Sequence, residues 1–277
     1  MSRVFEPFVV AEGEGPIVVL VHGGWTDHRT WDFFAPHLSD CYRVVRYDRR
    51  GHSRSPWAEP VPRRQDEDDL AALIEELGAP VHLVGNSYGG SISLGLIGRR
   101  PELVASVALH EPPLLGVARP GTPLSAERHV VLGALDEVAA EVRRGRPEVG
   151  ACRFVEEVAL GPGSWAMLPP HVKATMVANA HTLVGTLADP HWGALTDLAS
   201  PSVPLLLSDG TDSPVWLRMV ADELANSVVP HAERLTLAAA GHVPHLTNPA
   251  EYATAVRHFV SSAISSATSS TTMEVLS

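Results

Sequence analysis

Short apolar runs alternate with segments of helical periodicity along the first 110 residues. The apolar runs are continuous and rich in β-branched residues, as in strands that are buried on both faces of a parallel sheet. They predict strands at residues 17–21, 42–47, 81–84 and 104–109. The intervening segments predict helices at residues 31–38, 64–77 and 91–100. The alternation favours an α/β protein with one doubly wound, mostly parallel sheet.

The alternation stops at Pro112 and resumes only after residue 200. Between them the chain has helical spacing but no run with the pattern of a buried strand, and an insertion of about 90 residues is far longer than an ordinary connection. We therefore predict a core of residues 1–111 and 201–262, interrupted by a helical cap at residues 112–200. The Ser/Thr-rich end, residues 263–277, is expected to be a disordered tail.

A Gly-x-Ser-x-Gly pattern occupies residues 85–89, directly after one predicted strand and directly before a helix. So tight a turn gives the serine strained dihedral angles and projects its hydroxyl above the sheet. Side chains at Gly85 and Gly89 would collide with the neighbouring strand and helix. The N-terminus of the helix also favours negative charge that develops at this point. Ser87 is therefore the candidate nucleophile.

A serine nucleophile needs a base, and the base needs an acid that orients it. Among the fourteen histidines, His242 is the candidate base, because it follows a glycine just past the last predicted strand and its loop can reach back to Ser87. His245 is the rival. His22, in the glycine-rich loop after the first strand, is expected to brace that loop through hydrogen bonds.

The acid has three candidates. Asp212 is preferred, because it follows the strand predicted at residues 203–207 and precedes His242 in the chain. Glu111, at the end of the strand at residues 104–109, is the second candidate and has the alternative role of anchoring the hinge into the cap. Asp209 is the third, with the alternative role of shaping its turn.

The loop His22-Gly23-Gly24-Trp25 follows the first buried strand. Its small residues let backbone N–H groups face the cavity. We assign the oxyanion hole to the backbone N–H groups of Gly24 and of Tyr88, which follows the nucleophile. One such donor is typically worth about 3 kcal/mol of transition-state stabilisation.

These stretches resemble the α/β-hydrolase fold superfamily, over about residues 4–262 without the cap. The loop at residues 22–25, with Trp31 downstream, is similar to the family's His-Gly loop. Residues 48–55 are similar to its D-x-R-G-x-G-x-S turn, although His52 and Ser53 change the usual glycine pattern. The segment from Gly241 onward, with a later proline and phenylalanine, is similar to the family's terminal segment.

One departure bears on the acid. Gly210-Thr211-Asp212 is one residue shorter than the family's usual acid segment. Some relatives carry their acid after the strand that precedes the cap, which keeps Glu111 open.

The resemblance implies a serine hydrolase that cleaves a carboxylic ester or lactone through an acyl-enzyme, without a cofactor or a metal. Trp25, Trp165 and Trp192 are the candidate pocket residues, although packing of the cap onto the core would also explain the last two. A perhydrolase or haloperoxidase-like enzyme, a carbon–carbon bond hydrolase, a cyclase and a non-enzymatic ligand-binding receptor are alternatives on the same fold. A serine nucleophile disfavours the aspartate-dependent relatives.

Composition narrows the partners. The formal net charge of −11 repels phosphate backbones and argues against nucleic acid. No apolar run reaches the length of a membrane span, and the first residues lack the pattern of a secretion signal, so we expect none. Two isolated cysteines make neither a disulfide framework nor a zinc site and suit a reducing cytoplasm. We expect a cytoplasmic protein whose partner is a small molecule, with a homodimer as the candidate assembly.

Overall fold

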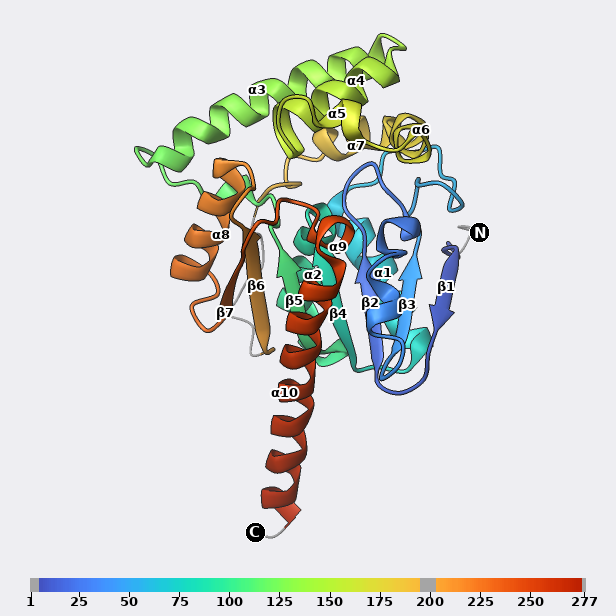
Figure 1. The fold of residues 1–277 in the computed structure, drawn as a ribbon, viewed down its shortest axis with the longest axis vertical. Coiled ribbons are helices and arrows are strands. Elements are labelled where there is room, and N and C mark those ends of the chain that lie inside the picture. The colour runs from blue at the N-terminus through green and yellow to red at the C-terminus, as the bar shows by residue number, and fades with distance from the viewer. Residues whose placement is uncertain (1–4, 195–202, 276–277) are drawn as a thin grey trace.

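A seven-stranded sheet forms the centre of the molecule (Figure 1). The structure is a computed structural model that describes residues 5–194 and 203–275, with the backbone alone from residue 269 onward. The strand order is β1-β3-β2-β4-β5-β6-β7, with β1 antiparallel to β3 and the other described pairs parallel. The strands are β1 (Val9–Glu12), β2 (Ile17–Val21), β3 (Arg43–Tyr47), β4 (Val81–Asn86), β5 (Val104–His110), β6 (Leu205–Gly210) and β7 (Glu233–Leu237).

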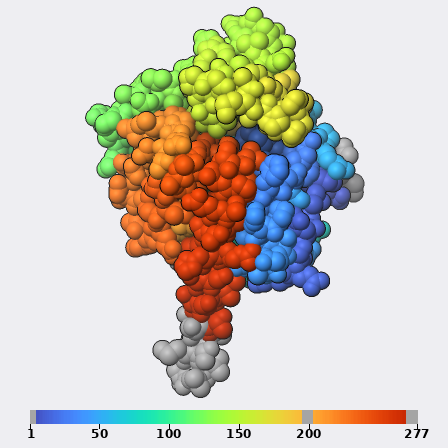
Figure 2. Space-filling view, in the orientation of Figure 1, coloured from blue at the N-terminus to red at the C-terminus, as the bar shows by residue number. Residues whose placement is uncertain are grey.

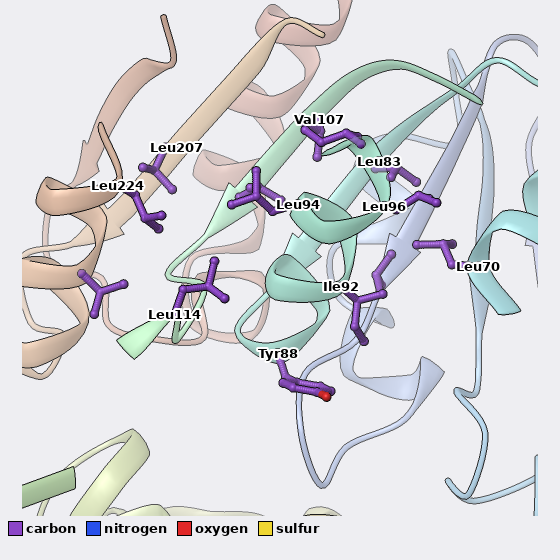
Figure 3. Close-up of a cluster of buried hydrophobic side chains, with 14 of the residues drawn as sticks. Leu70, Leu83, Tyr88, Ile92, Leu94, Leu96, Val107, Leu114, Leu207 and Leu224 are labelled. Atoms are coloured by element: carbon purple, nitrogen blue, oxygen red, sulfur yellow. The ribbon is translucent and has the colours of Figure 1, made fainter. Parts of the chain in front are cut away.

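Helices cover both faces of this sheet, because successive residues of each strand point to opposite sides. In β2, Val19 and Val21 join one buried cluster and Val18 and Leu20 join the other. The first cluster packs against α1 (Arg63–Leu77), α2 (Tyr88–Arg99) and α8 (Val215–Ser227), and Figure 3 shows part of it around α2. The second packs against α10 (Pro249–Val275). The continuous apolar runs of the sequence therefore belong to strands buried on both faces.

Helices α3 to α7 lie between β5 and β6 in the chain and sit over one end of the core (Figures 1 and 2). They are α3 (Pro123–Arg143), α4 (Pro147–Arg153), α5 (Ser164–Met167), α6 (Pro170–Asn179) and α7 (His181–Ala188), with a π-helical segment at Phe154–Ala159. We call this helical segment the cap. The boundary predicted between the cap and the core at residues 200 and 201 lies outside the described residues.

Two elements near the N-terminus differ from the pattern read in the sequence. Strand β1 carried no clear signal, because it has four residues, none of them fully buried, at the sheet edge. The helix expected at residues 31–38 is two 3₁₀ helices, His28–Trp31 and Ala35–His37, and Pro36 within the second has no N–H to donate. The other strands and helices expected in the first 110 residues begin and end within a few residues of their expected positions.

The C-terminal segment continues α10 to Val275, where a disordered tail was expected from residue 263. The Ser and Thr hydroxyls bond to carbonyl groups four residues earlier, as Ser265 does to Ser261 at 2.9 Å and Thr268 to Ile264 at 2.9 Å. The Ser/Thr-rich composition favours disorder, but in the helix these hydroxyls donate hydrogen bonds to carbonyl groups of the same helix. Residues 276–277 lie outside the described part. Within the described helices, none combines the length and apolar character of a membrane span.

Candidate active site

Ser87 lies in the turn between β4 and α2, with φ 53° and ψ −126°. These angles are unusual for a residue with a side chain and indicate stored strain. A Cβ atom on Gly89 would lie 2.2 Å from the carbonyl oxygen of Val21, and one on Gly85 would lie 2.8 Å from that of Gly89. Real Cβ atoms essentially never come so close, so glycine is needed on both sides of the serine. The turn has the strained strand-to-helix geometry that the sequence predicted.

His242 lies in the loop after β7 and is buried. Its Nδ1 donates a hydrogen bond to Oε2 of Glu111 at 2.7 Å, an arrangement that leaves Nε2 as the free acceptor of the ring. Nδ2 of Asn86 donates to the His242 carbonyl at 2.9 Å, and Nε2 of His110 donates to the Gly241 carbonyl at 3.2 Å. The ends of β4 and β5 therefore hold both the ring and the backbone of this loop.

Glu111 directly follows β5 and is fully buried. Its Oε1 accepts from the backbone N–H of Gly210 at 3.0 Å while Oε2 accepts from His242. Burial raises the pKa of this carboxyl, but the hydrogen bond and charge of His242 and the charge of His110 outweigh burial and lower the pKa to about 2. Glu111 also has φ 47°, a strained value that turns its side chain back toward the neighbouring strand.

Asp212, the acid preferred from the sequence, does not contact the histidine. Its side chain is exposed and accepts a hydrogen bond from the Thr211 hydroxyl at 3.0 Å. Asp209 forms an ion pair with Arg234 at 2.7 Å. The structure corrects the expectation: Glu111, kept open as the second candidate, is the carboxylate that meets His242. The turn after β6 faces Asp212 toward solvent, whereas β5 ends beside the His242 loop.

The glycine-rich loop after β2 is braced from the core. His22 accepts the Arg49 backbone N–H on Nε2 at 3.0 Å and donates from Nδ1 to the Gly23 carbonyl at 2.9 Å. Burial, followed by the charge of Arg49, lowers the pKa of His22 to about 3, so the ring is neutral. A Cβ atom on Gly23 would lie 3.2 Å from Cβ of Ser87, so this loop approaches the nucleophile closely. His22 has the bracing contacts that the sequence analysis expected.

One pocket, partly open to solvent, is lined by Ser87, His242, Gly24 and Tyr88. The nucleophile candidate, the base candidate and both oxyanion candidates therefore meet at one cavity. Among the described residues no hydrogen bond joins Ser87 to His242. Such contacts are often long before substrate binds. Apolar side chains from core and cap form most of the wall, among them Trp25, Leu135, Phe154, Leu183, Trp192 and Trp216.

Two of the three tryptophans expected in the pocket are there. Trp25 and Trp192 line it, and the Trp25 ring stacks on Phe154 of the cap with centroids 4.9 Å apart. Trp165 does not line it. Its ring instead faces Lys173, whose Nζ lies 5.5 Å from the ring centroid. The residue is on α5 and is partly buried against the apolar cluster that contains core and cap residues, so the packing alternative holds for Trp165.

His245, the rival base, does not line the pocket and makes its contacts elsewhere. Its Nε2 is 2.8 Å from the Thr30 hydroxyl, and its ring packs on Trp31 with centroids 4.4 Å apart. It belongs to the interior below the loop rather than to the pocket.

One group of described side chains has the spacing of a metal site: Asp27, His28 and Asp48, whose ligand atoms lie within 4.8 Å of one another. Protein groups already occupy these atoms. Oδ1 of Asp48 accepts from His28 Nδ1 at 2.6 Å, and Oδ2 of Asp27 accepts from Arg29 at 2.6 Å. The group braces the loops between β2 and β3 and offers no ready cation site.

The family model described as "Alpha/beta hydrolase family" matches residues 18–255. The chain belongs to the alpha/beta hydrolase family. The pimeloyl-[acyl-carrier protein] methyl ester esterase of Methylococcus capsulatus is similar to this alpha/beta hydrolase, with 30% identity over 267 residues, 92% of this chain and 98% of that protein. The uncharacterized hydrolase YraK of Bacillus subtilis is 43% identical over 107 residues, 37% of this chain and only 40% of YraK.

Among solved structures, an alpha/beta hydrolase from Sphaerobacter thermophilus matches with a TM-score of 0.70 and 28% identity, covering 83% of this chain and 88% of that one. The family and these relatives support a hydrolase. They do not define its substrate.

Two site residues of this alpha/beta hydrolase escaped the sequence analysis, Asn86 and His110. Asn86 is the variable position of the Gly-x-Ser-x-Gly pattern, and His110 is the last residue of β5. Each lies beside a candidate, Ser87 or Glu111, and that adjacency was the only available signal. Burial lowers the pKa of His110 to about 4, which keeps the ring neutral and able to accept from Ser208 while it donates to Gly241.

Proposed function

We propose that this alpha/beta hydrolase cleaves a carboxylic ester or lactone of a small, largely apolar substrate through an acyl-enzyme on Ser87. The observation that carries the proposal is the hydrogen bond from His242 to the buried, ionised Glu111, at the wall of the pocket that Ser87 also lines. A base oriented by an acid beside a serine at a strained turn is the arrangement that activates a hydroxyl for acyl transfer. We assign the triad as Ser87, His242 and Glu111.

In the acylation half, Oγ of Ser87 attacks the substrate carbonyl carbon and its proton passes to Nε2 of His242. The carbonyl oxygen becomes an oxyanion and accepts hydrogen bonds from the backbone N–H groups of Gly24 and Tyr88. Glu111 keeps its negative charge, fixes the ring tautomer and stabilises the imidazolium. The bond to the leaving oxygen then breaks, and His242 returns the proton to the departing alcohol.

In the deacylation half, a water molecule takes the place of the alcohol. His242 removes one proton from the water, the hydroxide adds to the acyl carbon, and the second tetrahedral oxyanion uses the same two N–H donors. Collapse releases the carboxylic acid and restores the Ser87 hydroxyl with the proton held by His242. The protein groups in both halves are the side chains of Ser87, His242 and Glu111 and the two backbone N–H donors.

Two observations support cleavage of an ester that carries an apolar acyl or alcohol group. The pocket wall is made mainly of aromatic and aliphatic side chains, with Thr182, Thr186 and Arg49 as its polar members besides the reacting groups. The Methylococcus capsulatus relative is named a methyl ester esterase, which fits cleavage of an ester.

The test is turnover of p-nitrophenyl acetate and butyrate by the wild-type chain, Ser87→Ala and Ser227→Ala. Ser227 carries an exposed hydroxyl at the end of α8 that bonds only to Glu223 among the described residues, so its removal is a matched control. We expect Ser87→Ala to lose turnover by about 10⁴-fold or more and Ser227→Ala to keep it. Equal turnover by Ser87→Ala and wild type would refute the proposal.

A further inference from the structure

The Gly24 amide, one of the two proposed oxyanion donors, sits in a loop that is fixed on both sides. On the core side, the carbonyl of Gly23 accepts hydrogen bonds from His22 Nδ1 at 2.9 Å and from a guanidinium nitrogen of Arg49 at 3.1 Å. On the other side Trp25 has φ 67°, a left-handed backbone conformation that a bulky residue rarely adopts. Something must hold Trp25 there, because strain of this kind persists only where the surroundings impose it.

Helix α6 of the cap provides the contact that holds Trp25 in this conformation. Asn179 is the last residue of α6 and is 2% exposed. Its Nδ2 donates to the Trp25 carbonyl at 3.3 Å and to the Thr26 carbonyl at 3.1 Å. Because two backbone carbonyl oxygens face this nitrogen, the assignment of the NH₂ and carbonyl ends of the Asn179 amide is fixed. The Trp25 ring stacks on Phe154, so side chain and backbone of this residue are both held by the cap.

Ser53 completes the arrangement. It stands at the second glycine of the family's turn at residues 48–55 and has φ 41°. Its backbone N–H donates to Asn179 Oδ1 at 3.0 Å, and its hydroxyl accepts from Asn179 Nδ2 at 3.2 Å and donates to Asp27 at 2.7 Å. A glycine there would relieve the strained angle but lose both hydroxyl contacts. The departure from the family pattern therefore serves the contact with the cap.

We propose that Asn179 is a positioning residue that couples the cap to the oxyanion hole. It holds the backbone at Trp25 and Thr26, and Ser53 orients it. The Gly24 N–H shares its peptide plane with the Gly23 carbonyl, which His22 and Arg49 hold. Asn179 holds the backbone further along the loop, at the Trp25 and Thr26 carbonyls, and so keeps the loop from turning this N–H away from the pocket. The inference rests on the proposed function, in which that N–H stabilises the oxyanion. It adds that the packing of the cap sets the catalytic rate as well as the shape of the pocket.

The same helix provides a matched control. The Thr175 hydroxyl accepts a hydrogen bond from Arg29 at 2.7 Å, which is another cap-to-core contact of α6. That contact is exposed and does not involve the backbone at residues 23–26. Thr175→Ala therefore removes a cap contact without releasing the oxyanion loop.

The test compares wild type with Asn179→Ala, Asn179→Asp, Ser53→Gly and Thr175→Ala, each checked for folding by its thermal midpoint. Asn179→Asp keeps the size and the acceptor for Ser53 but replaces the donor that faces two carbonyl oxygens. The measurements are kcat and KM for p-nitrophenyl butyrate and the Ki of an alkyl trifluoromethyl ketone. That inhibitor adds to Ser87 and places an oxyanion in the same hole, so its Ki reports the donor directly.

A small displacement of a catalytic group costs up to about 100-fold, so we expect both Asn179 variants to lower kcat by about 10-fold and raise Ki by a similar factor, with KM within about 2-fold. Ser53→Gly should shift both by about 3-fold, and Thr175→Ala by less than about 2-fold. Folded Asn179 variants that match Thr175→Ala in kcat and Ki would overturn the inference. If neither Asn179 variant folds, Ser53→Gly is compared with Thr175→Ala instead. Equal kcat and Ki in those two variants would then overturn the inference. Turnover that does not depend on Ser87 would overturn the proposed function, and this inference with it.

Discussion

The two halves of the candidate site are held by different parts of the molecule. The base half belongs to the core alone: His242 is fixed by Glu111, Asn86 and His110, all at the ends of β4 and β5. The oxyanion half is shared, because the core fixes the loop before Gly24 and the cap fixes it afterwards. In the proposed mechanism, proton transfer therefore depends on residues at the ends of the sheet strands, whereas oxyanion stabilisation and substrate fit also depend on the position of the cap.

The largest expected effect lies in the base half and concerns the two carboxylates. Glu111→Gln should lower kcat by about 10⁴-fold, because the amide cannot hold the required imidazole tautomer or balance its charge. Asp212→Asn should change kcat by less than about 2-fold, since this exposed carboxylate bonds only the neighbouring Thr211 among the described residues. The measurement is kcat for p-nitrophenyl butyrate.

The opposite ranking, with Asp212→Asn inactive and Glu111→Gln active, would contradict the assignment of Glu111 as the acid. Thermal midpoints of both variants separate a loss of chemistry from a loss of fold.

The second effect contrasts a glycine of the core with one of the cap. Gly89→Ala should destabilise the fold by about 3 kcal/mol, because the new Cβ would lie 2.2 Å from the Val21 carbonyl oxygen. Gly133→Ala, at an exposed position of α3 with nothing within 4 Å, should stabilise it by about 0.5–1 kcal/mol. Urea unfolding measures both. An undisturbed Gly89→Ala would show that the turn tolerates a side chain after all.

The third effect sharpens the role of the cap in substrate fit. Trp192→Ala should reduce kcat/KM for p-nitrophenyl butyrate by about 10-fold, because the indole lines the pocket and its burial against an apolar group is worth roughly 1–3 kcal/mol. Trp165→Ala, on the same cap but outside that wall, is the control and should change kcat/KM by less than about 2-fold. Equal losses in the two variants would mean that the cap acts through its overall stability.

The smallest effect per residue is a pH dependence that touches both halves. Burial lowers the pKa of His22 to about 3, of His110 to about 4, and of His52 and His245 well below the ordinary value of 6.5. The unfolded chain takes up protons on these rings below about pH 6.5 while the folded chain does not, so stability falls as pH falls. We expect roughly 1 kcal/mol lost per histidine between pH 7 and 5.5. A urea midpoint that is unchanged over this range would contradict the neutral assignments.

The sequence predicted the parts of the site that local order defines. Neighbouring residues alone were enough to recognise the Gly-x-Ser-x-Gly turn, the glycine-rich loop and the histidine after the last strand. The buried strands β2 to β6 were visible as apolar runs because both faces of each are covered. The edge strand β1 had no such signal.

The acid and the cap contacts could not be predicted in the same way. Strands β5 and β6 are neighbours, and a carboxylate follows each, so the choice depends on which side chain turns inward. The φ of 47° at Glu111 has no sequence signature, and neither has the exposure of Asp212. Trp165 and Trp192 are equally apolar in sequence, and only the folded cap separates them. Asn179 and Ser53 meet across 126 positions of the chain.

The central claim is that Ser87 carries the acyl group, and intact mass followed by peptide mapping tests it most directly. We would mix the wild-type chain with excess p-nitrophenyl butyrate and quench it in acid during turnover, because an activated ester acylates readily and lets the acyl-enzyme accumulate. The account predicts a mass increase of one butyryl group, located on the peptide that contains Ser87, and none in Ser87→Ala. A butyryl group on another residue, or release of p-nitrophenol through the site by Ser87→Ala at the wild-type rate, would contradict it.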